Sequence, residues 1–451
     1  MAGSLWTLAR VLIERGAQER SCRWSRAQLE HHQQRSVAAL RRFAMERSPF
    51  YARFHRGCDA RALAALPILS KAVMMEHFDE LVTDRRIRLT DVESHLSAGP
   101  DTGLFLDRYV ALATSGSTGR RGVFLFDEQE WIRAIAAITR PIAWAQAPGR
   151  AARPARGALI ASGASWHYSA RVGLALANRI APALRLDAAM PVSELVERLN
   201  AWRPQALATY PSVLRQLCAE QAAGRLRIDL QHIATSAEVL TAEVRAAARS
   251  VWQVTVQDTY GATEYAPIAS ECPLGRKHLF ENGAVIEIAD AQGRAVPPGE
   301  SGERVLLTVF GRRIQPLIRY EISDLVRVAG EACPCGRPFR VIESVDGREE
   351  DILHFAAQEA GADVAVHPNR FHEALENLGV EAWQVIREPD AVRVGLVGAR
   401  AAELRDRAEQ SVRHAIASAG ARVPPIVVQC LAALERGPSG KAPLILARHR
   451  H

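Results

Sequence analysis

From about residue 108 the chain alternates short apolar runs with Gly/Ser/Pro turns and with Ala/Arg-rich stretches of helical character. The apolar runs include YVALATSG, RGALIASG, PQALATY, HIATSAEVL and VTVQDTYG. Strands and helices that alternate in this way are typical of an α/β region whose strands are largely parallel. We therefore predict layered α/β structure for most of the chain. Before this region, residues 26–45 are polar and favour a helix.

The pattern changes in residues 283–330, where apolar and polar residues alternate with a period of two between turn signals. This alternation predicts an antiparallel sheet or a small barrel, so we expect a β-rich subdomain beside the α/β layers. We place a domain boundary at the VDGREED segment that follows. Residues 1–346 are then a large N-terminal domain and residues 347–451 a small α+β C-terminal domain.

Within the C-terminal domain the sequence predicts a helix at 370–378, a hairpin at 383–397 and a helix near 402–419.

Composition excludes several classes of protein. A chain of 451 residues is long enough for two or three domains, and 48% hydrophobic with 24% charged residues is globular rather than disordered. No apolar run approaches the roughly 18 residues that span a bilayer. The N-terminal residues do not have the pattern of a secretory signal. The expected compartment is therefore the cytosol. The net charge of +7 is spread among interleaved arginines and acids, which argues against nucleic-acid or membrane partners.

Lysine is rare in this chain. Only Lys71, Lys277 and Lys441 occur among 57 basic residues. Because arginine fills nearly every other basic position, each lysine is a candidate for a role that arginine does not serve.

A cluster of glycines and hydroxyl residues follows the apolar run YVALA. Glycines let the backbone approach an anion closely, successive N–H groups form a nest, and hydroxyls donate to phosphate oxygens. An ordinary turn is the alternative, and the spacing is not that of a P-loop NTPase. The cluster consists of Thr114, Ser115, Gly116, Ser117, Thr118, Gly119, Arg120, Arg121 and Gly122.

A second polar segment follows the run VTVQ. Tyr260 can stack on a base, Gly261 permits a tight turn, and Glu264 is a hard oxygen ligand suited to Mg²⁺. A plain strand-to-loop turn with an exposed glutamate is the alternative. The whole segment is Asp258, Thr259, Tyr260, Gly261, Ala262, Thr263 and Glu264.

Three further polar residues lie later in the chain. The carboxylate of Asp324, in RYEISD, is suited to accept hydrogen bonds from the vicinal hydroxyls of a ribose. The guanidinium of Arg348, in DGREED, can donate two hydrogen bonds to a sugar or a phosphate. Lys441 ends a flexible GPSGK loop. Each residue alone is compatible with an ordinary solvated surface position.

Seven cysteines are present, and their odd number and the absent signal argue against a disulfide framework. Cys272 and His278 lie upstream of the closely spaced Cys333 and Cys335. Three thiolates and one imidazole make a complete tetrahedral zinc set without an open position, which is typical of a structural site. Ordinary free thiols are the alternative.

In this order, the polar segments resemble the adenylate-forming superfamily of acyl-CoA synthetases, peptide-synthetase adenylation domains and luciferases, over nearly the whole chain. The stretches SPFYARF, LPILSK and AWRPQALATYPSVL look like the phenylacetate–CoA ligase-like branch, in which similar zinc sets occur. The resemblance implies a ligase that uses ATP and Mg²⁺ to convert a carboxylic acid, of the aromatic kind in this branch, to an acyl-adenylate. Pyrophosphate leaves, and an acceptor, usually coenzyme A, then takes the acyl group.

The resemblance also implies roles for residues of the large domain. Thr114 to Gly119 match the phosphate-binding loop, and Asp324 matches the ribose-binding aspartate. Thr263 matches the residue that touches the α-phosphate, and Glu264 matches the Mg²⁺ ligand. The two walls around the adenine match Ser236, Ala237 and Glu238 on one side and Asp258, Thr259, Tyr260 and Gly261 on the other.

At and beyond the domain boundary, Arg348 matches the arginine beside the ribose and Glu350 falls at the hinge. Lys441 matches the catalytic lysine, which the family carries on a mobile C-terminal domain.

An aromatic group in SGASWHYS is a candidate for the acyl pocket. It consists of Trp166, His167 and Tyr168, and we expect Tyr210 opposite it. Core packing is the alternative for these side chains.

Two departures from the family pattern bear on function. The phosphate loop ends in Arg120-Arg121-Gly122 where relatives often have Pro-Lys-Gly, which keeps a positive charge. The segment Ile352–Pro368 is longer than its counterpart, which helps form the thiol tunnel in relatives. The acceptor therefore stays open among coenzyme A, an amine and a carrier-protein thiol. A non-catalytic nucleotide-binding protein is the alternative of another class, and the retained Glu264, Asp324 and Lys441 argue against it.

Overall fold

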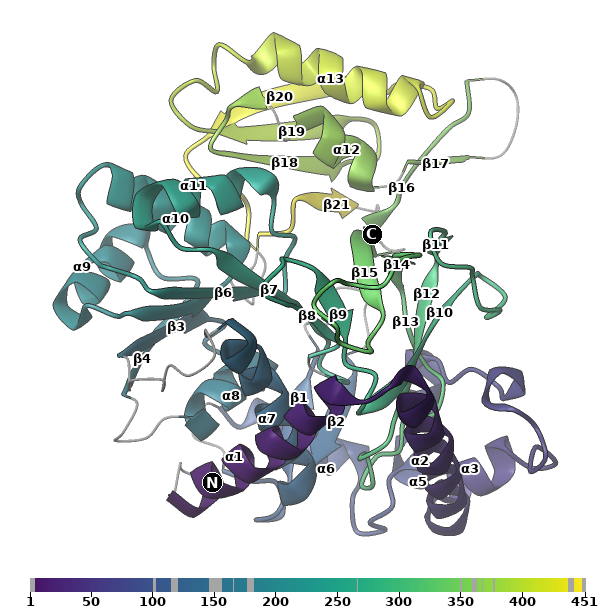
Figure 1. Cartoon of the computed structure of the whole chain (residues 1–451). Helices are drawn as coiled ribbons and strands as arrows, with labels where there is room; N and C mark the ends of the chain where they lie inside the picture. The colour runs from purple at the N-terminus through teal and green to yellow at the C-terminus, as the bar shows by residue number, and fades with distance from the viewer. Residues whose placement is uncertain are drawn as a thin grey trace.

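A computed structural model of the chain has a broad lower body and a smaller unit of sheet and helices above it (Figure 1). The lower body is called the large unit and comprises the described residues up to 348, and the upper one, from residue 351 on, is called the small unit. The structure describes residues 5–99, 103–114, 121–145, 156–164, 166–176, 182–265, 267–348, 351–358, 363–366, 368–375, 378–436 and 442–447.

The N-terminal part of the large unit is helical. Helix α2 (Arg26–Arg47) confirms the helix predicted at 26–45, and it begins with a capping box in which Gln28 N donates to Ser25 Oγ (3.2 Å) and Ser25 N to Gln28 Oε1 (2.8 Å). Among the described residues, no helix is both long and apolar enough to cross a membrane. The other helices here are α1 (Leu5–Arg20), α3 (Pro49–Phe54), α4 (Lys71–Glu76), α5 (Phe78–Leu81) and α6 (Leu89–Ser97), with 3₁₀ turns at Ser21–Arg23 and Leu63–Ala65.

Strands β1 (Val110–Ala113) and β2 (Val123–Phe126) form an antiparallel hairpin of their own. The run YVALATSG was predicted to belong to the parallel sheet, and this prediction is wrong. The physical reason is the short connection between the strands, because parallel neighbours need a crossover of a dozen or more residues.

The parallel strands predicted from the apolar runs are confirmed at β3 (Gly157–Ala161), β5 (Ala206–Thr209), β6 (His232–Ser236) and β7 (Val256–Tyr260), with β4 (Ala183–Asp187) at the edge. Helices lie on both faces of this part of the sheet (Figure 1). One face carries α7 (Glu128–Ala145) and α8 (Tyr168–Leu176), and the other carries α9 (Val192–Trp202), α10 (Pro211–Ala222) and α11 (Ala242–Trp252).

The same sheet continues with antiparallel strands beyond β7. The 10-stranded order is β11-β14-β15-β9-β8-β7-β6-β5-β3-β4. Strand β7 pairs in parallel with β6 and antiparallel with β8, so the change of direction occurs at β7. The antiparallel strands are β8 (Ala269–Glu271), β9 (Lys277–Leu279), β11 (Ser301–Gly302), β14 (Asp324–Val328) and β15 (Val341–Arg348).

A separate antiparallel sheet contains β10 (Ala284–Ala289), β12 (Arg304–Val309) and β13 (Tyr320–Ile322). It confirms the β-rich character predicted for residues 283–330. Strand β14, from the end of that range, joins the large mixed sheet instead.

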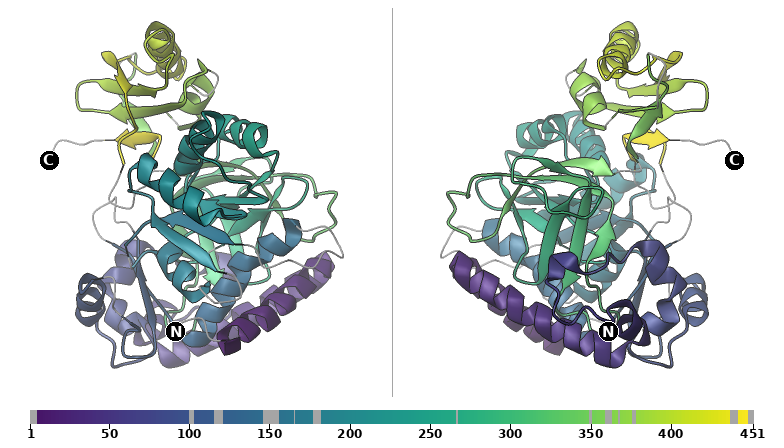
Figure 2. Two further views of the ribbon diagram at one scale, coloured as in Figure 1. Left: turned by 90° about the vertical axis from the view of Figure 1, so that its left-hand side faces the viewer. Right: turned by 90° about the vertical axis from the view of Figure 1, so that its right-hand side faces the viewer.

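Both views of Figure 2 show the small unit at the top of the molecule. It has its own cluster of buried apolar residues, which extends from Leu353 to Ile445. Helix α12 (Pro368–Leu375), the hairpin of β18 (Ala382–Arg387) and β19 (Val392–Val397), and helix α13 (Arg405–Ala417) confirm the three elements predicted here. Strand β15 passes through the predicted boundary at 346. The remaining strands are β16 (Leu353–Phe355), β17 (Val364–Val366), β20 (Ile426–Leu431) and β21 (Ile445–Ala447).

His55, at the end of α3, is fully buried in the N-terminal helical part. Its ring stacks on Phe54 with centroids 5.5 Å apart and meets Tyr51 edge-on at 5.1 Å. Neither ring nitrogen has a hydrogen-bond partner among the described residues. Burial, helped by the nearby Arg41 charge, lowers the pKa of His55 to about 4.

We expect His55 to destabilise the protein as the pH falls from about 6.5 to about 4. The unfolded chain binds a proton at His55 in this window and the folded chain does not, which contributes a slope of at most about 1.4 kcal/mol per pH unit. His55→Phe keeps the ring stacking and should remove this part of the slope in urea unfolding between pH 4.5 and 7. The exposed His31, changed to Phe, is the control, and an unaltered slope in His55→Phe would contradict the prediction.

Candidate active site

Four parallel strands, β3, β5, β6 and β7, end at one edge of the large sheet, where loops that follow the carboxyl ends commonly form binding sites. Ser236, at the end of β6, is the register partner of Thr259 on β7. The two segments predicted to face an adenine therefore lie on neighbouring strands. Ala237 adopts φ 71°, a left-handed conformation that is rare for alanine and marks a constrained turn after β6.

Tyr260 and Asp324 meet at this edge although they are 64 positions apart in sequence. The hydroxyl of Tyr260 donates to Asp324 Oδ2 at 2.5 Å, and Asp324 is 6% exposed. Asp324 is also the register partner of Arg348 in the β14–β15 pair. The structure thus brings the predicted base-stacking tyrosine to the predicted ribose-binding aspartate, with Arg348 on the next strand.

Glu264, in the turn after β7, is a buried carboxylate. Tyr320 donates from its hydroxyl to Glu264 Oε1 at 3.2 Å. Burial, together with the neighbouring Glu264, raises the pKa of Tyr320 well above its usual value, so the phenol stays protonated and acts as a donor. The buried guanidinium of Arg312 also interacts electrostatically with Glu264. Gly261 and Thr263 lie half-buried in the same turn.

The buried carboxylate of Asp258 contacts other side chains of the protein. Its Oδ2 lies 2.6 Å from Lys277 Nζ, and its Oδ1 accepts from Thr235 Oγ1 at 2.8 Å. The backbone N–H of Asp258 donates to Glu271 at 3.0 Å. The carboxylate of Asp258 therefore holds β7 to the strands β6 and β9.

Glu238 has a different environment from the adenine wall for which it was predicted. Its carboxylate accepts from Ser212 N (2.9 Å) and Ser212 Oγ (3.1 Å) at the start of α10, and from Ala442 N (3.0 Å). The side chain thus faces α10 and the C-terminal segment.

The phosphate-loop residues Ser115, Gly116, Ser117, Thr118 and Gly119 lie outside the described residues, as do Glu350 and Lys441. The two ends of the loop are described. Thr114 N donates to Gly122 O (2.9 Å), and Gly122 N donates to Thr114 Oγ1 (2.8 Å). These bonds close the mouth of the loop between β1 and β2.

The aromatic residues predicted for the acyl pocket have different surroundings, and core packing was the alternative for them. Tyr168 belongs to the hydrophobic core, where its ring packs against Phe126 and Trp131, which favours the packing role. Tyr210 is 2% exposed and its hydroxyl accepts from Ser162 N at 3.0 Å, beside the end of β3.

Trp166 and His167 lie in the turn before α8. The Arg121 guanidinium lies over the Trp166 ring at 4.7 Å, which links this turn to the end of the phosphate loop. His167 is buried, with Nδ1 3.0 Å from Ser169 Oγ.

The cysteine and histidine residues predicted as a metal set converge. The ligand atoms of Cys272, His278, Cys333 and Cys335 all lie within 4.8 Å of one another. Cys272 Sγ and Cys333 Sγ are 3.9 Å apart, and Cys335 Sγ lies 3.2 Å from His278 Nε2. Soft sulfur donors with one imidazole suit a four-coordinate metal, and all four positions are filled by protein.

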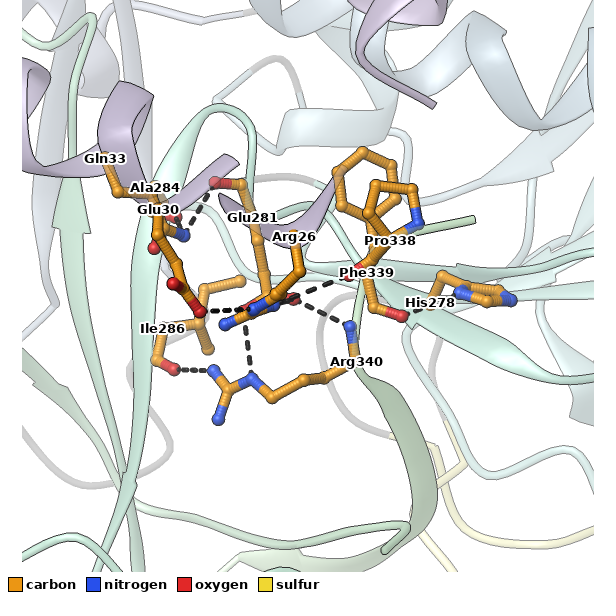
Figure 3. A network of polar contacts seen from close by, with 10 residues as sticks. All are labelled: Arg26, Glu30, Gln33, His278, Glu281, Ala284, Ile286, Pro338, Phe339 and Arg340. Atoms are coloured by element: carbon orange, nitrogen blue, oxygen red, sulfur yellow. Dashed lines mark hydrogen bonds and ion pairs between the residues drawn. The ribbon is translucent and has the colours of Figure 1, made fainter. Parts of the chain in front are cut away.

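The second nitrogen of His278 supports this arrangement. His278 Nδ1 lies 3.1 Å from the carbonyl oxygen of Phe339 (Figure 3). This contact fixes the ring, and Nε2 faces the Cys335 thiol. The same loop is held by Glu281, which is 1% exposed and accepts from Arg340 N (2.7 Å), Arg340 Nε (2.9 Å) and Arg26 Nη1 (3.2 Å) (Figure 3). The cluster is therefore built into a network that reaches α2.

Residues 106–308 match the family described as AMP-binding enzyme. A phenylacetate–coenzyme A ligase from Thermus thermophilus is 25% identical over 340 residues, which cover 73% of this chain and 72% of that protein. By the family match, residues 106–308 form an AMP-binding enzyme region within the chain.

Solved structures agree on the fold. A 2-hydroxyisobutyryl-CoA ligase in its postadenylation state has a TM-score of 0.72 at 17% identity, over 95% of this chain and 92% of that one. An amide bond synthetase from Marinactinospora thermotolerans has a TM-score of 0.50 at 19% identity, over 74% and 67% of the two chains.

Two residues that shape the site were not assigned a role from the sequence. Tyr320 was quoted within RYEISD without a role, and it is the donor to Glu264. Lys277 was noted for the rarity of lysine, and its ion-pair partner Asp258 was not foreseen.

We expect the Lys277–Asp258 ion pair to stabilise the large sheet. Lys277→Met leaves the nearly buried Asp258 carboxylate without its cation, and we expect a loss of about 2 kcal/mol in unfolding free energy, measured by chemical denaturation. The double variant Lys277→Met with Asp258→Asn should recover part of the loss, because no uncompensated charge remains. Equal stability of Lys277→Met and the wild type would refute this prediction.

Proposed function

We propose that this protein activates an organic carboxylic acid with ATP, forms an acyl-adenylate with release of pyrophosphate, and transfers the acyl group to coenzyme A. The observation that carries the proposal is the convergence of Tyr260, Asp324 and Glu264 at the carboxyl edge of the sheet. Aromatic acids are the first class to test, because a relative over most of the chain is a phenylacetate–coenzyme A ligase.

In this proposal the adenine lies between the Ser236–Ala237 turn and Tyr260, and Asp324 and Arg348 hold the ribose. Asp324 accepts from Tyr260, so its carboxylate is already oriented before a sugar hydroxyl arrives. The loop from Thr114 to Gly119 would take the phosphates through backbone N–H groups and hydroxyls.

During attack of the substrate carboxylate, negative charge develops around the α-phosphorus. Thr263 would donate to the α-phosphate, and Lys441 would add a positive charge whose interaction with the phosphate strengthens as the transition state forms. Mg²⁺, when held by Glu264, would neutralise charge on the leaving pyrophosphate. The donor bond from Tyr320 keeps the Glu264 carboxylate oriented toward this role.

We also propose the division of the chain into residues 1–346 and a mobile domain of residues 347–451. The separate apolar cluster of the small unit supports this division. Strand β15 joins the two, and the small domain would rotate about the residues that follow it, near Glu350.

The acceptor is proposed from the similarity to a coenzyme A ligase. The segment Ile352–Pro368 contains the β16–β17 hairpin, and we assign acceptor choice to it. Single-turnover reactions with preformed acyl-AMP test this point. Faster AMP release on addition of coenzyme A supports the proposal, and acceleration only by amines or a carrier protein supports the alternative acceptors.

Acid-dependent ATP–pyrophosphate exchange across a panel of carboxylic acids tests the first half-reaction. Exchange with at least one aromatic or aliphatic acid supports the proposal. Exchange with no acid in the presence of Mg²⁺ would favour a non-catalytic nucleotide-binding protein.

We further propose that Cys272, His278, Cys333 and Cys335 bind a structural zinc ion. Purified protein should contain about one zinc per chain, and chelation should lower its thermal stability, because metal binding at such a site is coupled to folding. Cys335→Ser should lower the zinc content, whereas Cys218→Ala, which removes a buried thiol on α10, should not. Zinc-free protein with unaltered stability would exclude the site.

We expect Lys441→Ala to slow acyl-adenylate formation by about 10²-fold or more, as removal of one electrostatic stabiliser does. The affinity for ATP should change little, since the proposed ATP residues belong mainly to the large domain. Arginine should restore little activity, because its planar fork differs from a compact ammonium group. Rapid-quench measurement of acyl-AMP checks the rate, and a wild-type rate in the alanine variant would remove Lys441 from catalysis.

A further inference from the structure

The residues on both sides of segment 437–441 are held together by one buried side chain. Gln384, on β18, donates from Nε2 to Glu435 O (3.1 Å) and Pro443 O (2.7 Å), and its Oε1 accepts from Glu435 N (3.2 Å). Gln384 is 1% exposed. The chain therefore leaves and re-enters the small unit at one place, on either side of a segment that lies outside the described residues.

Arg436, directly before this segment, contacts the large unit. Its Nη2 donates to Gln216 Oε1 on α10 at 2.6 Å, and its Nη1 donates to the carbonyl oxygen of Ala188 in the turn after β4. Both bonds carry the charge of the guanidinium, which makes them stronger and shorter than bonds between neutral groups.

Ala442, directly after the segment, contacts the same region. Its N–H donates to Glu238 Oε1 at 3.0 Å. The two bonds from Ser212 fix that carboxylate at the start of α10. The acceptors Ala188 O, Gln216 and Glu238 thus meet both sides of the segment, next to the turn that we assign to the adenine.

These contacts join two units with separate cores. Residues of β6, α10 and the turn after β4 pack in one apolar cluster, and residues of the small unit pack in another. The contacts named here are a few hydrogen bonds, which involve the partly exposed side chains of Arg436, Gln216 and Glu238. A few such bonds break at far lower cost than a packed core.

We propose that Arg436 is a positioning residue. With Gln216, Ala188 and Glu238 it holds the segment that contains Lys441 against the large unit for acyl-adenylate formation, and these contacts break before acyl transfer. The proposal rests on the proposed adenylation function and on the role assigned there to Lys441. It adds a specific set of contacts that select one of the two half-reactions.

The test measures the two half-reactions separately. Arg436→Met removes the charge at nearly constant length and should slow acyl-AMP formation about 10-fold or more at saturating ATP and acid, the loss expected for a charge-assisted hydrogen bond. The KM values for ATP and acid should change little. Acyl transfer from supplied acyl-AMP should keep the wild-type rate, because the contacts are absent in that step.

Gln216→Leu removes the same bond from the large unit and should slow the same step. The double variant should be no slower than Arg436→Met alone, because both substitutions delete one interaction. Arg436→Lys should recover part of the rate, since it keeps the charge. Arg413→Met is the matched control, because Arg413 is an exposed arginine of α13 whose partner is Glu409, and both half-reactions should be unaffected.

The outcomes separate this proposal from the proposed function. Selective loss of adenylation in Arg436→Met and Gln216→Leu supports the positioning role. Equal slowing of both half-reactions, additive losses in the double variant, or wild-type rates in both single variants would overturn it. If wild-type protein forms no acyl-adenylate with any acid, the proposed function itself fails. If thermal melting shows that Arg436→Met does not fold, the rates of Gln216→Leu decide the outcome.

Discussion

Strand β7 connects the two halves of the large sheet, because it pairs in parallel with β6 and antiparallel with β8. On its parallel side, the loops after β5 and β6 collect at one edge. On its antiparallel side, the sheet continues to β14 and β15, which bring Asp324 and Arg348 into register. A turn that follows β7 therefore reaches both groups of strands, and Tyr260 and Glu264 lie in or beside that turn. The proposed nucleotide site depends on this one change of strand direction.

The acidic residues at this edge are oriented by neutral donors more than by cations. Tyr260 donates to Asp324, Tyr320 to Glu264, and Ser212 to Glu238. A neutral donor orients a carboxylate and leaves its negative charge available for a sugar hydroxyl or a cation. Asp258 differs in that its carboxylate forms a direct ion pair with Lys277. The site thus separates carboxylates that hold the fold from carboxylates that are suited to bind.

Much of this architecture could be predicted because its causes are local. Ser25 and Gln28 signal the start of α2 within four residues, and the apolar runs of β3, β5, β6 and β7 indicate buried strands wherever they pair. The metal set could be predicted because cysteine and histidine are few and chemically distinctive. Strand pairing at β1 could not be predicted from its own residues, since the short loop after it decides the partner.

The polar contacts between distant segments were beyond sequence reasoning. Glu238 accepts from Ala442, 204 positions later, and nothing in either segment indicates that they meet. In a Ser-Ala-Glu turn, the glutamate side chain can face a nucleotide base or the start of a helix, and the three residues alone favour neither. Only the path of the chain through the small unit decides between these orientations.

Cys272 and Cys333 are 61 positions apart, yet their sulfur atoms are 3.9 Å apart. The chain leaves this point, forms β9 to β14, and returns to it. Closing a loop of this size costs only slightly more entropy than closing a short one. Tyr260 lies a short distance before Cys272 in the sequence, and Asp324 lies a similarly short distance before Cys333. In the terms of polymer networks, a metal ion bound by the cluster would be a crosslink. It would make Tyr260 and Asp324, 64 positions apart in sequence, close neighbours by connectivity.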